Sequence, residues 1–295
     1  ADNRMGAAMG WMMIAKLAQW NHRWDDALEA LGELEKIYGD LQQYPLEDIM
    51  FRNKNTPESI FEVQRTYTAG GLAVTTNVAA ICTPSHNGKG IYDGVEIPEM
   101  GTGMTTWTSM RPNSYFCDGL QTKKGNDKRK TLNMAWEYDG KPFSNVGTRP
   151  WLGPKFWCPG MQNTADFNNQ KIFRYADAVL MMSECYAEQE NIDESIRYLN
   201  MVKERAGLAP YTFKNIESLM EEIQKERGRE LLGEFQRKFD LVRWGIWYQM
   251  TYDYTNYSTL KENMLPCHEY YPIPDKEVVY SGGALDNKAY NEYGM

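Results

Sequence analysis

The segment ERGRELLGEFQRKFDLVRW, which runs from Glu226 to Trp244, is the most distinctive stretch of this 295-residue sequence. Within it, Glu226, Glu230 and Glu234 recur every four residues, so a continuous helix would place the three carboxylates on one face. Like charges at this spacing repel each other unless cations neutralise them. The nearest cations in the sequence are Arg227, Arg229, Arg237 and Arg243, and arginine is suited to bidentate pairing with carboxylates.

Large apolar side chains alternate with these charges, so the charged groups cannot all face water. Two interpretations follow. The segment forms either an acid/base site or a half-buried network of Arg, Glu and Asp side chains that fixes one helix pair against another. We favour the structural interpretation, because a spread of many paired charges suits a brace better than a reaction centre.

Two helical hairpins are predicted around this segment. Residues 174–207 carry a broad apolar stripe at helical spacing, and Asn191 with Glu194 resembles a capping box that starts the second helix. A further helix is expected at about Ile216–Leu232, and residues 234–247 are expected to form a turn that leads into another helix.

The other hairpin is predicted at residues 4–39. Its second helix should turn its apolar positions inward, namely Ala27, Leu28, Leu31, Leu34 and Ile37. Much of the 34-residue tetratricopeptide pattern, in which small residues let two helices approach closely, is matched by the spacing of Trp11, Ile14, Ala15, Ala27 and Leu31.

The residues between the hairpins, 40–173, are rich in Gly, Pro, Thr, Asn and aromatic residues. Short strands are expected at Ile60–Gln64 and Thr131–Tyr138, and residues 248–295 are expected to form an irregular, Tyr-rich tail. The predicted fold class is therefore mainly α: tetratricopeptide-like helical hairpins with a loop-rich irregular region carrying short β-strands, in one domain over residues 1–295.

Composition excludes several functions. The net charge of −8 argues against nucleic-acid binding, and no apolar run reaches the length of a membrane span. No sequence motif for a metal or a cofactor is present. The five cysteines are odd in number and widely separated, so scattered buried thiols are expected. The 9 Trp and 19 Tyr residues predict either a large core or a surface that stacks against ligands.

Catalysis has little support in the sequence. The three histidines are His22, His86 and His268, no nucleophile elbow is present, and no spacing singles out a carboxylate pair among 40 acidic residues. We therefore expect a binding protein and no enzyme. A glycoside hydrolase is kept as an alternative, because a carboxylate pair can be assembled by the fold.

The segment from Glu226 resembles the C-terminal signature of the SusD/RagB family, roughly E-R-x-R-E-L-x-x-E-G-x-R-x-x-D-L-x-R-W. This chain differs at Phe235, where the family usually has Gly, and at Lys238, where an aromatic residue is common. Other stretches resemble family motifs in the same order: Pro57–Glu62, Asp127–Arg129, Arg174–Asp177, Leu199–Leu208 and Tyr271–Pro274. The closing motif Q-N-P-G-Y is degraded here to residues 286–290.

The resemblance implies a SusD-like fold, with further helical repeats and a lipidated cysteine ahead of Ala1, so we expect the chain to be N-terminally incomplete. It implies an outer-membrane, cell-surface lipoprotein that touches the membrane only through that anchor. Such a protein captures glycan, or sometimes peptide, and delivers it to a SusC-like TonB-dependent transporter. A tetratricopeptide-type scaffold for a protein partner inside the cell is the alternative from another class.

The matched motifs are structural, so the ligand residues must be sought in the loop-rich region. Sugar rings stack on Trp and Tyr, while their hydroxyls need polar partners. Trp107 leads, because Thr, Ser and Gly surround it in an open loop. The other predicted contacts are Tyr67, Asn77, Tyr92, Asp93, Arg111 and Asn113. Trp136, Trp151 and Trp157 are expected to be packing residues.

Overall fold

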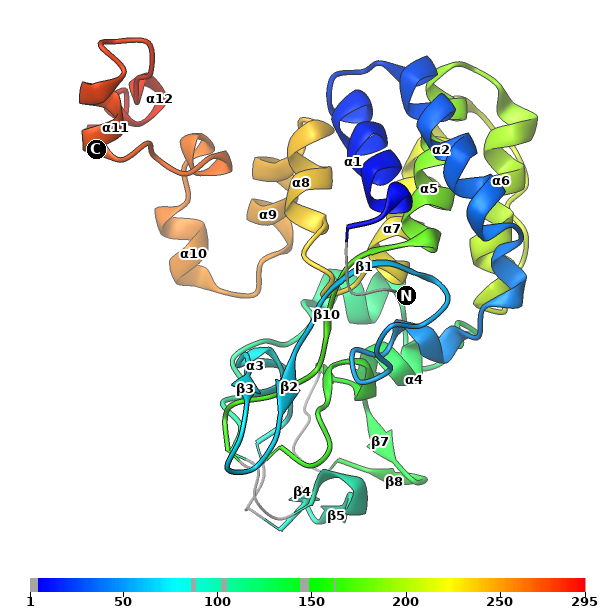
Figure 1. Cartoon of the computed structure of the whole chain (residues 1–295), viewed down its shortest axis with the longest axis vertical. Helices are drawn as coiled ribbons and strands as arrows, with labels where there is room; N and C mark the ends of the chain where they lie inside the picture. The colour runs from blue at the N-terminus through cyan, green and yellow to red at the C-terminus, as the bar shows by residue number, and fades with distance from the viewer. Residues whose placement is uncertain (1–4, 86–88, 102–104, 144–148, 162, 295) are drawn as a thin grey trace. The chain divides into compact units, whose positions relative to one another are not determined.

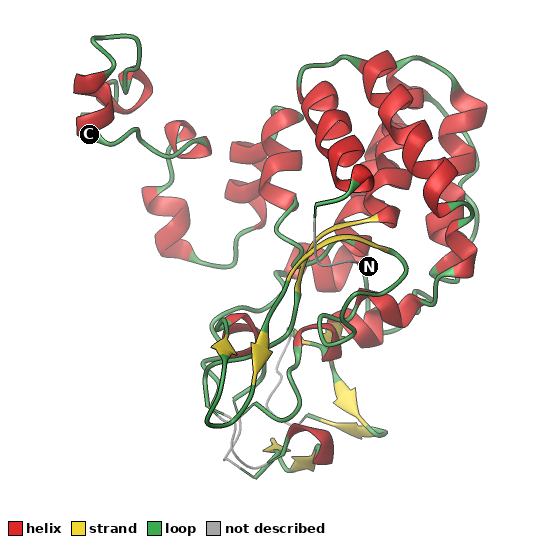
Figure 2. Cartoon of the chain, viewed as in Figure 1, coloured by secondary structure: helices red, strands yellow, loops and turns green. Residues whose placement is uncertain are grey.

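The computed structural model describes residues 5–85, 89–101, 105–143, 149–161 and 163–294 (Figure 1). The chain divides into two compact units, of which the first ends at Arg237 and the second begins at Lys238. Helices predominate and the strands are short (Figure 2). The predicted fold class is confirmed.

Five helices form the helical part of the first unit: α1 (Ala7–Trp20), α2 (Trp24–Tyr38), α5 (Tyr175–Glu188), α6 (Ile192–Arg205) and α7 (Ile216–Glu230). The pairs α1/α2 and α5/α6 are hairpins, and α5 also packs against α2 and α7 (Figure 1). Both predicted hairpins are therefore present. Helix α5 is buried on nearly all sides, and each fully buried Leu, Val or Met contributes about 1.5–3 kcal/mol to stability.

Two local predictions in these helices were wrong. Ile37 is 54% exposed, because the inward face of α2 is formed by Ala27, Ala30, Leu31 and Leu34. Asn191 makes no side-chain cap, and the Glu194 carboxylate instead accepts hydrogen bonds from Arg197. The helix predicted at about Ile216–Leu232 is confirmed as α7, which ends at Glu230, and Glu234 lies in the predicted turn that follows.

An antiparallel ribbon links the helices to the loop-rich region. Strand β1 (Ser59–Val63) pairs with β10 (Gln170–Arg174), with Ser59 opposite Arg174 and Val63 opposite Gln170. The predicted strand at Ile60–Gln64 is thus confirmed within one residue. Because β10 leads directly into α5, the ribbon fixes both ends of the loop-rich region against the helices (Figure 1).

The loop-rich region consists of short elements around a second core. Its elements include β2 (Thr66–Tyr67), β3 (Ala73–Val74), α3 (Val78–Cys82), β4 (Ile91–Tyr92), β5 (Val95–Glu96), α4 (Lys130–Asn133), β6 (Met134–Ala135), β7 (Glu137–Tyr138), β8 (Lys141–Pro142) and β9 (Trp151–Leu152). Four two-stranded pairs form here: β2–β3, β4–β5, β6–β9 and β7–β8. Trp157 lies fully buried in the second core, against which Trp136 and Trp151 pack, so all three are packing residues as predicted.

The predicted strand at Thr131–Tyr138 was only partly correct. Residues 130–133 form the helical turn α4, and strands follow only at Met134–Ala135 and Glu137–Tyr138. The cause is local: the Asp127 carboxylate accepts the backbone N–H of Arg129 at 2.9 Å. This side-chain turn starts the helical backbone before the strand can begin.

The second unit contains short helices where an irregular tail was predicted. Helix α8 (Arg237–Arg243) begins at the boundary, and α9 (Trp247–Tyr254), α10 (Ser258–Asn263), η6 (Pro266–Glu269), α11 (Asp275–Tyr280) and α12 (Lys288–Asn291) follow. All five cysteines are buried and unbridged, as expected. Across the described ranges of both units, no helix has the length and apolar character needed to cross a membrane.

Candidate ligand-binding site

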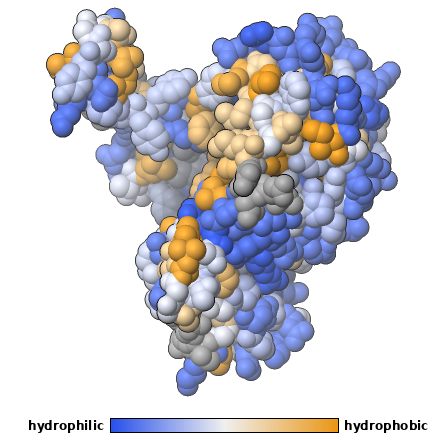
Figure 3. Space-filling view, viewed as in Figure 1, coloured by the Kyte–Doolittle hydropathy of each residue, from blue (hydrophilic) through white to orange (hydrophobic). Residues whose placement is uncertain are grey.

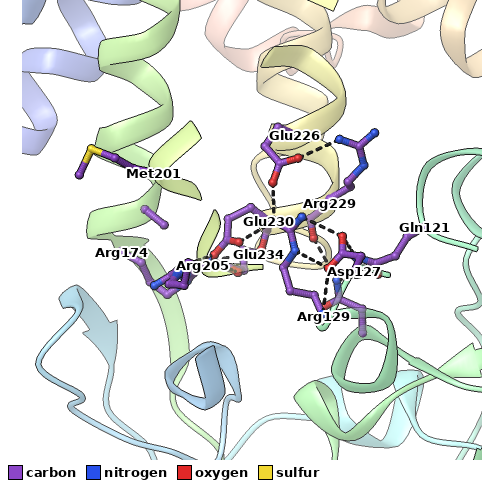
Figure 4. A network of polar contacts seen from close by, with 12 residues as sticks. Gln121, Asp127, Arg129, Arg174, Met201, Arg205, Glu226, Arg229, Glu230 and Glu234 are labelled. Carbon is purple, nitrogen blue, oxygen red and sulfur yellow. Dashed lines mark hydrogen bonds and ion pairs between the residues drawn. The ribbon is translucent and has the colours of Figure 1, made fainter. Parts of the chain in front are cut away.

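The charged segment forms a buried network of ion pairs (Figure 4). At its centre, Arg174 lies 2.7 Å from Glu58, 3.0 Å from Glu230 and 2.8 Å from Glu234. Arg205 adds a 2.6 Å contact to Glu230. All these side chains are almost completely excluded from solvent.

Arg129 extends the network. Its guanidinium pairs with Glu226 at 2.7 Å, Glu230 at 2.8 Å and Asp127 at 2.8 Å (Figure 4). Lys155 pairs with Glu234 at 2.7 Å. The network therefore joins the residue before β1, β10, α6, α7 and the loop-rich region, and most of its members come from the motifs that resemble the SusD/RagB family.

The four arginines named from the sequence have several kinds of partner. Arg227 pairs with Asp177, Arg237 donates to the carbonyl of Gln224, and Arg243 pairs with Asp240. Of the four arginines named from the sequence, Arg229 contacts Glu226, at 2.8 Å. The cations that neutralise Glu230 and Glu234 are distant in sequence, because α7 faces β10 and α6 in the folded chain.

Electrostatics support the structural interpretation of this network. Burial by itself raises the pKa of Glu230, but Arg205, Arg174 and Arg129 outweigh burial and hold that pKa far below its usual range. The pKa of Glu58 is lowered in the same way, with Arg174 and Arg205 outweighing burial. Glu58 and Glu230, held ionised by buried arginines and excluded from water, have the character of structural ion pairs that brace the fold, which favours the structural interpretation over an acid/base site.

The loop that carries Trp107 is anchored through its backbone. The Trp107 N–H donates to the Ala80 carbonyl at 2.7 Å, and the Ser109 N–H donates to the Ile81 carbonyl at 2.9 Å. Both carbonyls belong to α3. The indole side chain remains 51% exposed, which presents a large ring on a fixed backbone.

Tyr67 and Asn77 lie in the same part of the loop-rich region. The Tyr67 ring stacks on Phe167, with centroids 6.2 Å apart, and remains 39% exposed. The Asn77 amide donates to the carbonyl of Thr164 at 2.8 Å. Both residues are therefore held by the segment 164–167.

Within this segment, Asp166 provides the link to the loop that carries Trp107. Its backbone forms a two-way bridge with Thr76, and its carboxylate accepts the Ala79 N–H at 2.8 Å, which fixes the start of α3. Since α3 also anchors the Trp107 loop, residues 164–167 hold Tyr67, Asn77 and Trp107 in one framework. Burial raises the pKa of Asp166 to about 6.

Two more predicted residues are fixed by other contacts. Arg111 donates to the carbonyls of Arg149 and Pro150, and its guanidinium lies 4.6 Å from the Trp151 ring centroid. The Asn113 side chain accepts the Phe116 N–H at 3.0 Å. Both side chains organise the backbone around them.

Tyr92 occupies the core, where no ligand can stack on it. Its side chain is 1% exposed, and its ring lies parallel to Trp157 with centroids 6.2 Å apart. The physical reason is the β4–β5 hairpin, whose Asp93-Gly94 turn directs Tyr92 inward. Asp93 itself occupies that turn with a φ of 46°. The geometry thus makes Tyr92 a packing residue.

Sequence reasoning missed Asp166 and Phe167, which hold the aromatic and amide candidates together. No motif or periodicity marks either residue, since their importance comes from contacts with residues about 90 to 100 positions away. His86 lies outside the described residues. Elsewhere, in the portion of the chain that the structure describes, no cluster of His, Cys, Asp and Glu has the geometry of a metal site.

Fold and site together define a class of protein: a tetratricopeptide-like helical scaffold, braced by buried ion pairs, that carries a loop-rich region with exposed aromatic rings. Comparison with known proteins shows which family the chain resembles. The SusD family model matches residues 151–290. On this match, the curated relative below and the shared fold, the chain is similar to the SusD family.

A curated relative, SusD-like protein P25 from Formosa agariphila, is 34% identical over 175 residues, which cover 56% of this chain and 32% of the relative. A crystal structure of a SusD superfamily protein from Bacteroides vulgatus has 26% identity and a TM-score of 0.63, over 92% of this chain and 60% of that chain.

Surface glycan-binding protein A from Bacteroides thetaiotaomicron shares the fold. Its structure in complex with laminarihexaose has 19% identity and a TM-score of 0.69, covering 96% of this chain and 64% of that chain. This chain thus spans less than two thirds of the length of each of these relatives.

Proposed function

We propose that the protein binds oligosaccharide or polysaccharide through the loop-rich region, without cleaving it. The observation that carries the proposal is the exposed Trp107 ring on a loop that is hydrogen-bonded to α3. A large ring held in water on a fixed backbone is costly unless it meets an apolar face. Sugar rings offer such a face, and their hydroxyls can be met by polar neighbours.

The geometry around Trp107 supports this ligand class. Tyr67 offers a second exposed ring, and Asn77 adds an exposed amide whose oxygen can accept a hydrogen bond from a sugar hydroxyl. All three are tied to residues 164–167, so their relative positions are set before a ligand arrives. The laminarihexaose complex of a protein with the same fold adds support for glycan as the ligand.

Calorimetry against a panel of oligosaccharides, including laminarihexaose, tests the proposal. Trp107→Ala should weaken binding about tenfold or more, because it removes the stacking platform. Trp20→Ala is the matched control, since Trp20 is also partly exposed but lies on α1. Unchanged affinity in Trp107→Ala would remove Trp107 from the site. Binding of peptides with no saccharide binding would contradict the glycan assignment, and release of shortened sugars would contradict the non-catalytic one.

We further propose that the protein acts at the cell surface, in the outer membrane, and passes its ligand to a SusC-like TonB-dependent transporter. The support is the SusD family match over residues 151–290 together with the shared fold. Co-purification from membranes that express the transporter tests it. We expect a complex that survives the Trp107→Ala change, since ligand and transporter would use different surfaces.

A further inference from the structure

The second unit contains a pocket that the loop-rich region does not share. Its volume is about 480 Å³, within the range of roughly 300–1,000 Å³ typical of small-molecule sites. Residues 266–273 form one wall and residues 286–293 the other; α12 lies within the second wall, and α11 lies between the two walls in the sequence (Figure 1). Four tyrosines line it: Tyr270, Tyr271, Tyr290 and Tyr293.

Specific side-chain contacts hold the two walls together. The Asn287 side chain accepts the Ile273 N–H and donates to the Ile273 carbonyl, both at 2.8 Å. The Tyr290 hydroxyl donates to the carbonyl of Tyr270. Cys267 lies buried at the base of this arrangement. The pocket is therefore shaped by directed hydrogen bonds between its walls.

The lining combines exposed aromatic faces with hydrogen-bonding groups of both kinds. Tyr271 is 85% exposed, and Tyr270 and Tyr293 are also largely open to solvent. Glu269 and Glu292 supply acceptors, while the Lys288 ammonium supplies donors and lies 3.2 Å from Asp286. Hydroxyl groups on a ligand can both donate and accept, so this mixture suits a polyhydroxylated ring.

Charge narrows the ligand class further. Three acidic residues and one lysine line the pocket, which disfavours an anionic ligand. A cationic ligand is disfavoured at the Tyr271 ring, because the Lys238 ammonium already lies 4.5 Å from its centroid. A neutral ligand with an apolar ring face and several hydroxyls fits what remains.

We propose that this pocket is a second saccharide site, which takes one or two neutral sugar units and is independent of the loop-rich region. All residues that line the pocket belong to the second unit, so the site includes no residue of α3 or of the Trp107 loop. The proposal therefore goes beyond the function assigned above, and each can fail without the other.

Nuclear magnetic resonance of the full chain labelled with fluorotyrosine tests this proposal. The probes are laminarihexaose and neutral gluco-, xylo- and manno-oligosaccharides. We expect the signals of Tyr270 and Tyr293, assigned from single Tyr→Phe variants, to shift saturably with at least one of these sugars. The signal of Tyr280, an exposed tyrosine outside the pocket, should not move.

The affinity test uses Trp107→Ala as the background, so that the loop-rich region contributes little. In that background, Tyr270→Ala combined with Tyr293→Ala should weaken the remaining binding about tenfold or more, and Tyr280→Ala should leave it unchanged. Circular dichroism of each variant checks folding, and Tyr270→Phe, which keeps the ring, should retain binding.

Three outcomes would overturn the second site. These are the absence of tyrosine shifts with every sugar, equal effects of the pocket and Tyr280 variants, and shifts caused by tetramethylammonium but by no sugar. The two proposals remain distinguishable. Loss of the loop site alone would leave the tyrosine shifts in place, whereas loss of the pocket alone would leave the Trp107 effect in place.

Discussion

At the scale of single residues, Arg174 is a central member of the buried ion-pair network, because it contacts three carboxylates: Glu58, Glu230 and Glu234. Arg174→Ala leaves Glu58 and Glu234 buried with fewer counter-charges. We expect a loss of about 3–5 kcal/mol in the free energy of unfolding, measured by urea denaturation. Arg197→Ala is the matched control, since Arg197 is an exposed arginine paired with Glu194, and it should cost less than about 1 kcal/mol.

If the charged segment supports the fold and does not contact ligand, changes in it should affect stability before they affect affinity. Arg237 donates to Gln224 and Asp240 pairs with Arg243, so replacing either should reduce folding stability before it reduces affinity. Thermal unfolding and calorimetry on Arg237→Ala separate the two effects. A folded, equally stable variant that had lost sugar binding would show this division to be wrong.

Asp166 makes stability depend on pH. Its pKa is raised to about 6 in the folded state, so folding favours the protonated carboxyl. The contribution of Asp166 is therefore fully present below about pH 4, the unfolded value, and is lost as pH rises through about 6. Asp166→Asn removes this titration. Between pH 4 and pH 7, the free energy of unfolding should fall less in this variant than in the native chain, and the difference should reach up to about 3 kcal/mol.

Urea denaturation across that pH range measures the effect. Glu262→Gln, on the exposed surface of α10, serves as the control and should follow the native curve. Parallel curves for the native chain and Asp166→Asn would show that Asp166 does not titrate in this window. The Asp166 carboxylate also fixes the start of α3, which anchors the Trp107 loop. Saccharide affinity measured at the same pH values therefore shows whether ionisation of Asp166 affects binding at Trp107.

At the scale of elements, α1 presents an apolar outer face. Met13, Ile14, Leu17 and Trp20 are exposed on it, and Leu17 is 59% open to solvent. Figure 3 shows apolar residues gathered over this helix. Contiguous apolar surface of this kind promotes association.

Leu17→Lys should therefore reduce the binding of a hydrophobic dye and reduce self-association, with a change of no more than about 0.5 kcal/mol in the free energy of unfolding. Sedimentation velocity and dye fluorescence measure both effects. Leu260→Lys changes an exposed leucine on α10 and is the comparison variant. Equal behaviour of the two variants would show that the α1 face has no special role.

At the scale of the whole molecule, the brace predicts sensitivity to acid. The folded-state pKa values of Glu58, Glu62 and Glu230 are lowered, since their cation partners outweigh burial. These groups contribute stability that is present above their unfolded pKa of about 4.3 and is lost as pH falls below it. The native chain should thus unfold cooperatively in acid, and helix content measured by circular dichroism should fall with exposure of the Trp157 core.

The Asp166 and glutamate effects have opposite signs, so the two can be separated. Asp166 alone would make the protein more stable as pH falls towards 4, and the glutamates would make it less stable below that point. A stability maximum near pH 5 is expected. A monotonic rise in stability down to pH 3 would show that the brace carboxylates are not held ionised by their partners.

The sequence by itself determined what depends on neighbouring residues. Helical periodicity is a local property, so the hairpins at residues 4–39 and 174–207 and the strand near Ile60 were predictable from it. The segment from Glu226 was also sufficient to indicate the family. Its density of carboxylates and guanidinium groups is also compatible with an acid/base site, but in the folded chain Glu226, Glu230 and Glu234 are buried and paired with cations.

Only the tertiary structure decided which charges pair and which loops meet. Arg129 and Glu230 are 101 residues apart, and Arg174 and Glu58 are 116 apart, so no periodicity could match them. The same holds for Asp166, which reaches Ala79 across 87 residues. Ion pairs and side-chain contacts act through space over a few ångströms, and in loops without a repeating backbone the sequence does not specify which residues come that close.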